Sequence, residues 1–190
     1  MDQGMARELL GLPSGKRLLL FGALNVTDKR KGIDYLIEAL RRMEKQDVEL
    51  VVFGQVKDDI RGLFPVPIHS MGYLSDESKI VALYNAVDMF ITSSLEENLP
   101  NTIMESMACG TPCVGFEIGG IPEMIDHRVN GYVANYKDAG DLANGIQWVL
   151  EHEDRLALSD ACVKKVQENY TEEVVAKQYT ALYEKLLKGE

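Results

Sequence analysis

Short runs of apolar residues alternate along the chain with segments in which apolar positions recur at helical spacing. The runs are apolar at nearly every position, as in strands that are buried on both faces of a parallel sheet. We expect such strands at residues 17–22, 50–53, 66–71, 87–92, 112–116 and 131–134. Gly22, Gly54 and Gly72 stand at the ends of the first three runs, which is typical of a strand that gives way to a turn.

The intervening segments predict helices, because their apolar residues fall three and four positions apart. The expected helices cover about 32–45, 76–86, 102–108, 121–125, 138–150, 154–168 and 171–187, and Asp76 is suited to cap the second of them. Strands that alternate with helices predict an α/β fold with a doubly wound parallel sheet. We expect residues 1–190 to form one domain.

The composition is that of an ordinary globular domain. The chain has 190 residues, 46% of them apolar, and a formal net charge of -10. This charge disfavours nucleic acid or an anionic membrane as a partner of the whole surface, so any anionic ligand must be held locally. The three cysteines and three histidines match no paired metal-binding spacing. We therefore expect buried thiols in a reducing compartment and no metal site.

Residues 93–105 hold the densest group of polar side chains. They run from an expected strand through a loop into an expected helix, and Pro100 is suited to the first position of that helix. Free amides at the helix start and the positive end of its dipole would favour a phosphate. Because ligands bind outside the carboxyl ends of parallel strands, we expect this loop to share one rim with residues 22–31, Gly54 and Gly72.

Two carboxylates, Glu97 and Glu105, flank this helix start. Glu97 precedes the helix, whereas Glu105 lies five residues beyond Pro100, roughly 7 Å further along the axis. That separation does not suit two carboxylates that share one water or proton, but it suits two that accept hydrogen bonds from the ends of one long ligand. On spacing alone, the alternative stays open that Glu97 is a solvated loop acid and Glu105 a surface acid.

These residues resemble a known family. Glu97 through Glu105, followed by Ser106-Met107-Ala108-Cys109-Gly110-Thr111-Pro112-Cys113-Val114-Gly115, is similar to the E-x7-E signature and the trailing E-A-M-A-C-G-x-P-V-V of the retaining glycosyltransferases of GT-B fold, family 4 type. The segments Gly119-Gly120-Ile121-Pro122-Glu123-Met124-Ile125, Asn130-Gly131-Tyr132-Val133, Lys31-Gly32 and Gly72-Tyr73-Leu74 resemble its G-G-x-x-E-x-I, N-G-x-L, K-G and G-x-V. The resemblance covers about residues 6–150 and implies the C-terminal, Rossmann-like half of that fold, which binds a nucleotide-sugar donor.

The resemblance also implies a role for each matching residue. Glu97 would face the donor sugar, Glu105 would bond the ribose hydroxyls and Lys31 would hold the diphosphate. The amides around Asn98, Leu99, Asn101 and Thr102 would cradle the distal phosphate and sugar, Tyr73 and Leu74 would border the base, and Gly22 is the first-strand glycine of the site.

Two departures from the family pattern alter the expected site. The family carries an arginine directly after the first-strand glycine, where this chain has Ala23. Arg30 or Lys29 is a candidate replacement for that cation, unless both are solvated loop residues, and Asn25 is a candidate for a bond to a phosphate or sugar oxygen. The loop Asn98-Leu99-Pro100-Asn101 stands where many relatives have Phe-Gly-Leu, so we expect an amide cradle of different shape.

The leading hypothesis is the donor-binding half of a retaining hexosyltransferase of polysaccharide biosynthesis, with Glu97 and Lys31 as catalytic residues. The donor would be a nucleotide diphosphate sugar, the acceptor a hydroxyl group, and no metal or other cofactor is implied. We expect this chain to be inactive alone, because a separate N-terminal domain would bind the acceptor and meet the helices over 154–187. Two alternatives stay open, a module that binds a nucleotide sugar without transfer and a GT-B epimerase.

The expected location is the cytoplasm, with any membrane contact at the inner face through that N-terminal domain. No stretch approaches the ~20 apolar residues of a membrane-spanning helix. Charges at Asp2, Arg7 and Glu8 do not fit a secretory signal.

Overall fold

The computed structural model describes residues 1–26, 28–43, 47–55 and 61–188. The strands are β1 (Arg17–Asn25), β2 (Val48–Gln55), β3 (Ile68–Gly72), β4 (Met89–Thr92), β5 (Cys113–Phe116) and β6 (Gly131–Ala134). The helices are α1 (Gln3–Leu10), α2 (Ile33–Arg42), α3 (Glu77–Ala86), α4 (Asn101–Ala108), α5 (Ile121–Met124), α6 (Ala139–Leu150), α7 (Arg155–Asn169) and α8 (Glu172–Lys188), with 3-10 turns η1 (Lys29–Lys31) and η2 (Arg61–Leu63).

The strands of the described residues form one sheet in the order β3-β2-β1-β4-β5-β6, and every neighbouring pair is parallel. The first strand, β1, lies in the middle of the sheet. The chain then adds β2 and β3 toward one edge, crosses back to place β4 on the other side of β1, and adds β5 and β6 toward the second edge. The predicted doubly wound α/β fold is confirmed. The strand order reverses between β1 and β4, and ligands of such sheets bind at the carboxyl ends of the strands at this switch point.

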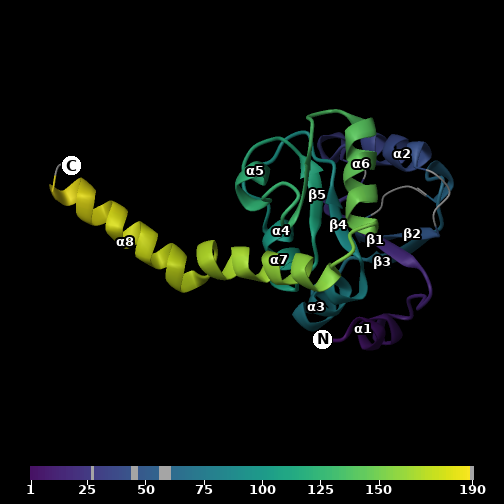
Figure 1. Cartoon of the computed structure of the whole chain (residues 1–190), viewed down its shortest axis with the longest axis horizontal. Coiled ribbons are helices and arrows are strands. Elements are labelled where there is room, and N and C mark those ends of the chain that lie inside the picture. Colours follow the sequence, from purple (N-terminus) through teal and green to yellow (C-terminus); the bar gives the residue numbers. More distant parts are fainter. Residues whose placement is uncertain (27, 44–46, 56–60, 189–190) are drawn as a thin grey trace.

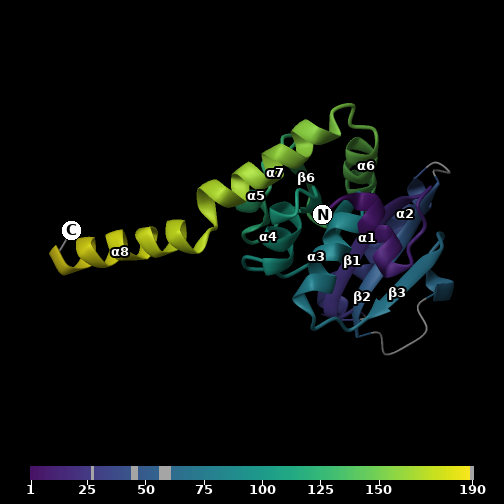
Figure 2. The same ribbon diagram turned by 90° about the horizontal axis from the view of Figure 1, so that it is seen from below.

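Helices cover both faces of the sheet (Figures 1 and 2). Successive residues of a strand point to opposite faces. Leu19 and Phe21 of β1 accordingly pack in the core beneath α2 and α6, whereas Leu18 and Leu20 pack with α1, α3 and α4. All four side chains are buried, which explains why the strand is apolar at consecutive positions.

Several element ends differ from the predicted ones. α2 ends at Arg42, and the predicted end at Lys45 lies outside the described residues. β1 continues past Gly22 to Asn25, with a shift in its register against β2 after Gly22. No prediction covers α1, although Asp2 caps it by accepting a hydrogen bond from the amide of Met5.

Pro100 does not occupy the first helical position, contrary to the prediction. Its φ of -71° and ψ of 118° are extended, and α4 begins one residue later, at Asn101. The proline ring fixes φ at a value that suits either a helix or an extended segment, so the sequence alone left ψ undetermined. The correction moves the free amides of the helix start one residue along the chain.

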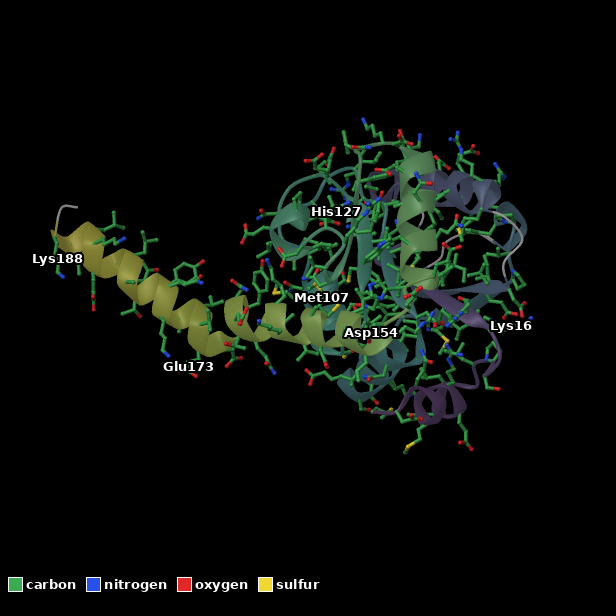
Figure 3. The ribbon with its side chains drawn as sticks, viewed as in Figure 1. Lys16, Met107, His127, Asp154, Glu173 and Lys188 are labelled. Atoms are coloured by element: carbon green, nitrogen blue, oxygen red, sulfur yellow. The ribbon has the colours of Figure 1, made fainter. Side chains whose placement is uncertain are left out.

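The last two helices run past the sheet and then away from it. α7 packs against α4 and buries Leu158 and Cys162, whereas no side chain of α8 is buried. α8 extends away from the rest of the chain (Figure 1), and Lys188 near its end lies clear of the other elements (Figure 3). The first turns of α8 border a pocket that Leu99 and Glu123 also line. Within the described ranges, no helix combines the length and apolar character needed to cross a membrane.

Candidate functional site

An ion pair lies at the switch point of the sheet. Lys31 follows β1 and Glu97 follows β4, the two strands between which the order reverses. Lys31 Nζ lies 2.5 Å from Glu97 Oε1, and the two side chains are 30% and 15% exposed. The fold therefore brings together the two residues that the sequence singles out for a phosphate and a sugar, from positions 66 residues apart.

Backbone contacts fix the position of Lys31. Ser93 donates its hydroxyl to the carbonyl of Lys31 over 2.9 Å, and the amide of Leu95 donates to the carbonyl of Arg30 over 2.7 Å. Gly32 has a φ of +62°, and a Cβ there would lie 1.9 Å from the carbonyl oxygen of Ser93. Only glycine fits such an approach, so Gly32 allows the segment after β1 to pack directly on the loop after β4.

The opposite side of this loop is held by Gly119 and Gly120. The amide of Gly120 donates to the carbonyl of Asn98 over 2.5 Å. A Cβ on Gly119 would lie 2.0 Å from the carbonyl oxygen of Glu97. Tyr136 adds a third anchor by donating its hydroxyl to the carbonyl of Leu95 over 3.0 Å. The loop that carries Glu97 is therefore fixed from β1, from the turn after β5 and from the segment after β6.

The start of α4 lies at the end of the same loop. No side chain caps α4, whereas aspartate side chains cap α1, α3, α6 and α7. Asn98, Leu99 and Asn101 are exposed, and Thr102 is half-buried. The first amides of α4 and the positive end of its dipole are thus available to an anion.

A row of packed side chains leads from β1 to Glu105. A Cβ on Gly22 would lie 1.9 Å from the ring of Phe53, so the absence of a side chain at Gly22 makes room for that ring. Phe53 packs edge-on against Tyr84, with ring centroids 6.2 Å apart. Tyr84 in turn donates its hydroxyl to Glu105 Oε2 over 3.0 Å.

Arg30 is paired with the neighbouring Asp28, and the charges of Glu96 and Glu97 also contribute to raising its pKa. Its guanidinium pairs with Asp28 at 2.7 Å, and its hydrogen bond to Asp28 holds the pKa of that carboxyl below its usual value. Asp28 also caps η1 by accepting from the amide of Arg30. Lys29 is exposed, and Asn25 ends β1 opposite Gln55.

Tyr73 and Leu74 follow β3, at the edge of the sheet. Tyr73 is exposed, and Leu74 packs partly against the core that contains Tyr84. The predicted rim is therefore present as a set of loops at one end of the parallel strands. The roles of its residues toward a ligand stay predictions.

Sequence reasoning missed three residues that shape this site. The sequence pattern assigns Phe53 only to an expected strand and Tyr84 only to an expected helix, and the contact between their rings depends on the packing of α3 against β2. Tyr136 follows β6, and nothing in the sequence pattern predicts its hydrogen bond to the carbonyl of Leu95. The paired glycines Gly119 and Gly120 stand out in the sequence, but their contact with the loop that carries Glu97 depends on the fold.

Comparisons with known proteins identify relatives of the chain. The family described as Glycosyl transferases group 1 matches residues 15–152. An uncharacterized glycosyltransferase of Methanocaldococcus jannaschii is 28% identical over 187 residues, which cover 93% of this chain and 47% of that protein.

Solved structures share the fold of the chain. Sucrose-phosphate synthase from Thermosynechococcus elongatus aligns with a TM-score of 0.81 at 24% identity, over 100% of this chain and 50% of that one. HepE of Anabaena, in complex with UDP-glucose, aligns with a TM-score of 0.77 at 23% identity, over 96% of this chain and 52% of that one. The chain spans 31% and 47% of the length of two curated relatives that it matches.

Proposed function

The chain belongs to the family Glycosyl transferases group 1, and from that premise we propose that it is the donor-binding half of a retaining glycosyltransferase. In this proposal it binds a nucleotide diphosphate sugar and delivers a hexose to the hydroxyl group of an acceptor. The acceptor site lies in a further domain, consistent with a chain that spans about half of the length of several relatives.

One observation carries the proposal: the pair of Lys31 and Glu97 lies at the switch point, beside the uncapped start of α4. A cation and a helix start provide charge and amides for a diphosphate. A carboxylate next to them can accept hydrogen bonds from sugar hydroxyls. The complex of HepE with UDP-glucose supports a ligand of this class for a protein of the same fold.

The ligand would lie along the rim in a defined order. The diphosphate occupies the space between Lys31 and the first amides of α4, with the sugar toward Glu97. The ribose extends toward Glu105, and the base lies near Tyr73 and Leu74. This order follows the sequence resemblance. Lys31, Glu97 and Tyr73 follow the carboxyl ends of β1, β4 and β3.

The chemical demand of transfer is the departure of a diphosphate while positive charge develops on the sugar ring. Lys31 and the dipole of α4 stabilise the negative charge on the leaving group. Glu97 orients the sugar and stabilises the positive charge. Lys31 is paired with Glu97, so the diphosphate must compete with Glu97 for the ammonium group.

The direct test is a titration of this chain with the diphosphates of uridine, guanosine and adenosine and with their sugars. A ligand at 100 times its Kd adds about 2.7 kcal/mol to the free energy of unfolding, so a rise in Tm is expected with at least one base. Lys31→Ala should abolish most of that rise, and Lys164→Ala, which removes an exposed lysine of α7, is the matched control. If no diphosphate raises the Tm, the donor site is wrong.

The retaining outcome requires a second test with the full-length protein. The anomeric configuration of the product, followed by NMR from the first turnover, should match that of the donor. An inverted product would contradict the retaining mechanism, although the donor site could still stand.

A further inference from the structure

The hydroxyl group of Tyr84 is directed at one oxygen of Glu105. It donates to Oε2 over 3.0 Å, from α3 to α4. Both helices lie on the same face of the sheet (Figure 1). No other hydrogen bond to this carboxylate occurs among the described residues.

Packing holds the ring of Tyr84 in place. Tyr84 is 1% exposed, and its ring lies edge-on between Phe53, at 6.2 Å, and Phe90, at 6.1 Å. Thr111 donates its hydroxyl to the backbone carbonyl of Tyr84 over 2.8 Å. The donor atom is therefore fixed relative to β2 and β4, the strands that carry the two rings.

The phenol group also keeps its proton. Burial, followed by the charge and the hydrogen bond of Glu105, raises the pKa of Tyr84 far above its ordinary value. Tyr84 is thus a donor at every pH at which an enzyme of this kind is assayed. Glu105 can satisfy this donor only as an acceptor, which leaves its other oxygen for a ligand.

Glu105 is otherwise exposed on α4. A glutamate side chain in that setting samples many rotamers, and each ligand that it binds must immobilise it. The hydrogen bond from Tyr84 restricts that freedom before the ligand arrives. The row from Gly22 through Phe53 and Tyr84 to Glu105 connects this restraint to the rim where the ligand is expected.

We propose that Tyr84 is a positioning residue, which orients the carboxylate of Glu105 so that the protein recognises the ribose hydroxyls of its nucleotide. The proposal rests on the proposed function, because it takes Glu105 as the acceptor for those hydroxyls. Tyr84 itself does not touch the ligand. Its effect is confined to ligands that carry ribose hydroxyls.

The experiment compares the affinity of the chain for UDP and for 2′,3′-dideoxy-UDP, by calorimetry. The wild-type chain should bind the dideoxy ligand about tenfold more weakly, the amount expected for a lost hydrogen bond to a charged group. Tyr84→Phe should weaken UDP binding by about threefold to tenfold and leave the dideoxy affinity unchanged. The guanosine or adenosine pair takes the place of these probes if one of those bases binds instead.

If Tyr84 had a merely structural role, Tyr84→Phe would lower the affinity for both ligands equally, and that result would overturn the proposal. Full ribose discrimination in Tyr84→Phe would also overturn it. Absence of any binding to the wild-type chain would instead contradict the proposed function, so the two failures are distinct.

Glu105→Asp provides a second variant that leaves the core intact. It shortens the side chain by one methylene and withdraws the carboxylate from Tyr84. It should lose ribose discrimination as Tyr84→Phe does, and the double variant should show no further loss. An additive loss in the double variant would contradict the coupling of the two residues.

Discussion

The ammonium group of Lys31 and the carboxylate of Glu97 are in contact, with 2.5 Å between Nζ and Oε1. This ion pair must be broken, at least in part, when a diphosphate binds to Lys31. Glu97 therefore opposes the binding of a diphosphate in two ways, by competing for Lys31 and by repelling the phosphate charge. The same carboxylate is the group proposed to favour the developing cation during transfer.

Replacement of Glu97 by glutamine should consequently separate binding from transfer. We expect Glu97→Gln to bind UDP about fivefold more tightly, which corresponds to about 1 kcal/mol of relieved charge interaction, and to lower kcat in the full-length protein. Calorimetry and a donor turnover assay measure the two effects. Glu96→Gln removes the same charge one residue away, at an exposed position, and should change neither. A Glu97→Gln chain that binds UDP as weakly as Lys31→Ala would refute the competition.

Lys31 and its neighbour Arg30 should differ strongly in their effect on the nucleotide. Lys31→Ala should weaken UDP binding by roughly tenfold or more, because it removes a charged hydrogen bond, and slow transfer by roughly 10² to 10³-fold. Arg30 pairs with Asp28 and is largely exposed, so Arg30→Ala should change the affinity by less than about threefold. An equal loss in both variants would mean that Arg30 leaves Asp28 for the phosphates and takes the place of the arginine absent at Ala23.

The sequence predicted the sheet more reliably than the details of the site, for a physical reason. Strands buried on both faces must be apolar at nearly every position, so β2 and β4 to β6 could be placed from hydrophobicity alone. The continuation of β1 beyond Gly22 could not, because its last residues are paired irregularly with β2. The start of α3, which Asp76 caps, was also predictable, whereas the start of α1, which Asp2 caps, was not predicted.

The contacts of the site depend on packing between distant segments. That Lys31 and Glu97 share a rim follows from the parallel strands, but their direct contact depends on Gly32 against Ser93. The hydrogen bond from Tyr84 to Glu105 requires the relative placement of α3 and α4. Neither contact leaves a periodic signal in the sequence.

Gly32 and Gly11 form a matched pair for testing the contact that places Lys31. Both have positive φ, +62° and +66°, but a Cβ on Gly11 meets nothing within 4 Å, whereas one on Gly32 would lie 1.9 Å from the carbonyl oxygen of Ser93. Gly11→Ala should cost about 1–2 kcal/mol of stability, the strain of that backbone conformation. Gly32→Ala should cost at least about 3 kcal/mol, because the clash with backbone adds to the same strain. Urea denaturation measures both, and equal costs would show that the close approach is not needed.

Because of Tyr84, the free energy of unfolding should fall at alkaline pH. Its pKa is raised by burial in the folded chain, whereas an unfolded tyrosine ionises near pH 10. Below that pH the phenol is protonated in both states and its contribution to stability is fully present. Above it the unfolded chain loses the proton first, so the free energy of unfolding should fall by about 1.4 kcal/mol per pH unit.

The control is Tyr84→Phe, which lacks this decrease. Urea denaturation of both chains from pH 9 to 11 gives the difference between their free energies of unfolding, in which the contributions of the other tyrosines cancel. Parallel curves would mean that the phenol ionises in the folded chain.

Asp88 lies at the opposite end of β4 from the site, and its side chain is 2% exposed. Its Oδ2 accepts from Arg7 over 3.0 Å and from the amide of Leu18 over 2.8 Å, and its Oδ1 accepts from Arg155 over 2.6 Å and from Arg17 over 3.2 Å. These bonds connect α1, β1 and α7 to the start of β4.

Asp88→Asn should therefore destabilise the chain by about 3–5 kcal/mol, because it leaves the buried guanidinium of Arg7 without a counter-charge. Arg155→Ala is the control, because Arg155 is 41% exposed and should cost only about 1 kcal/mol. Urea denaturation gives both values. The fraction of Asp88→Asn that remains folded should bind UDP with unchanged affinity, because the carboxylate lies at the amino end of the strand. An Asp88→Asn chain as stable as Arg155→Ala would show that Arg7 is sufficiently compensated by the backbone carbonyls that it also contacts.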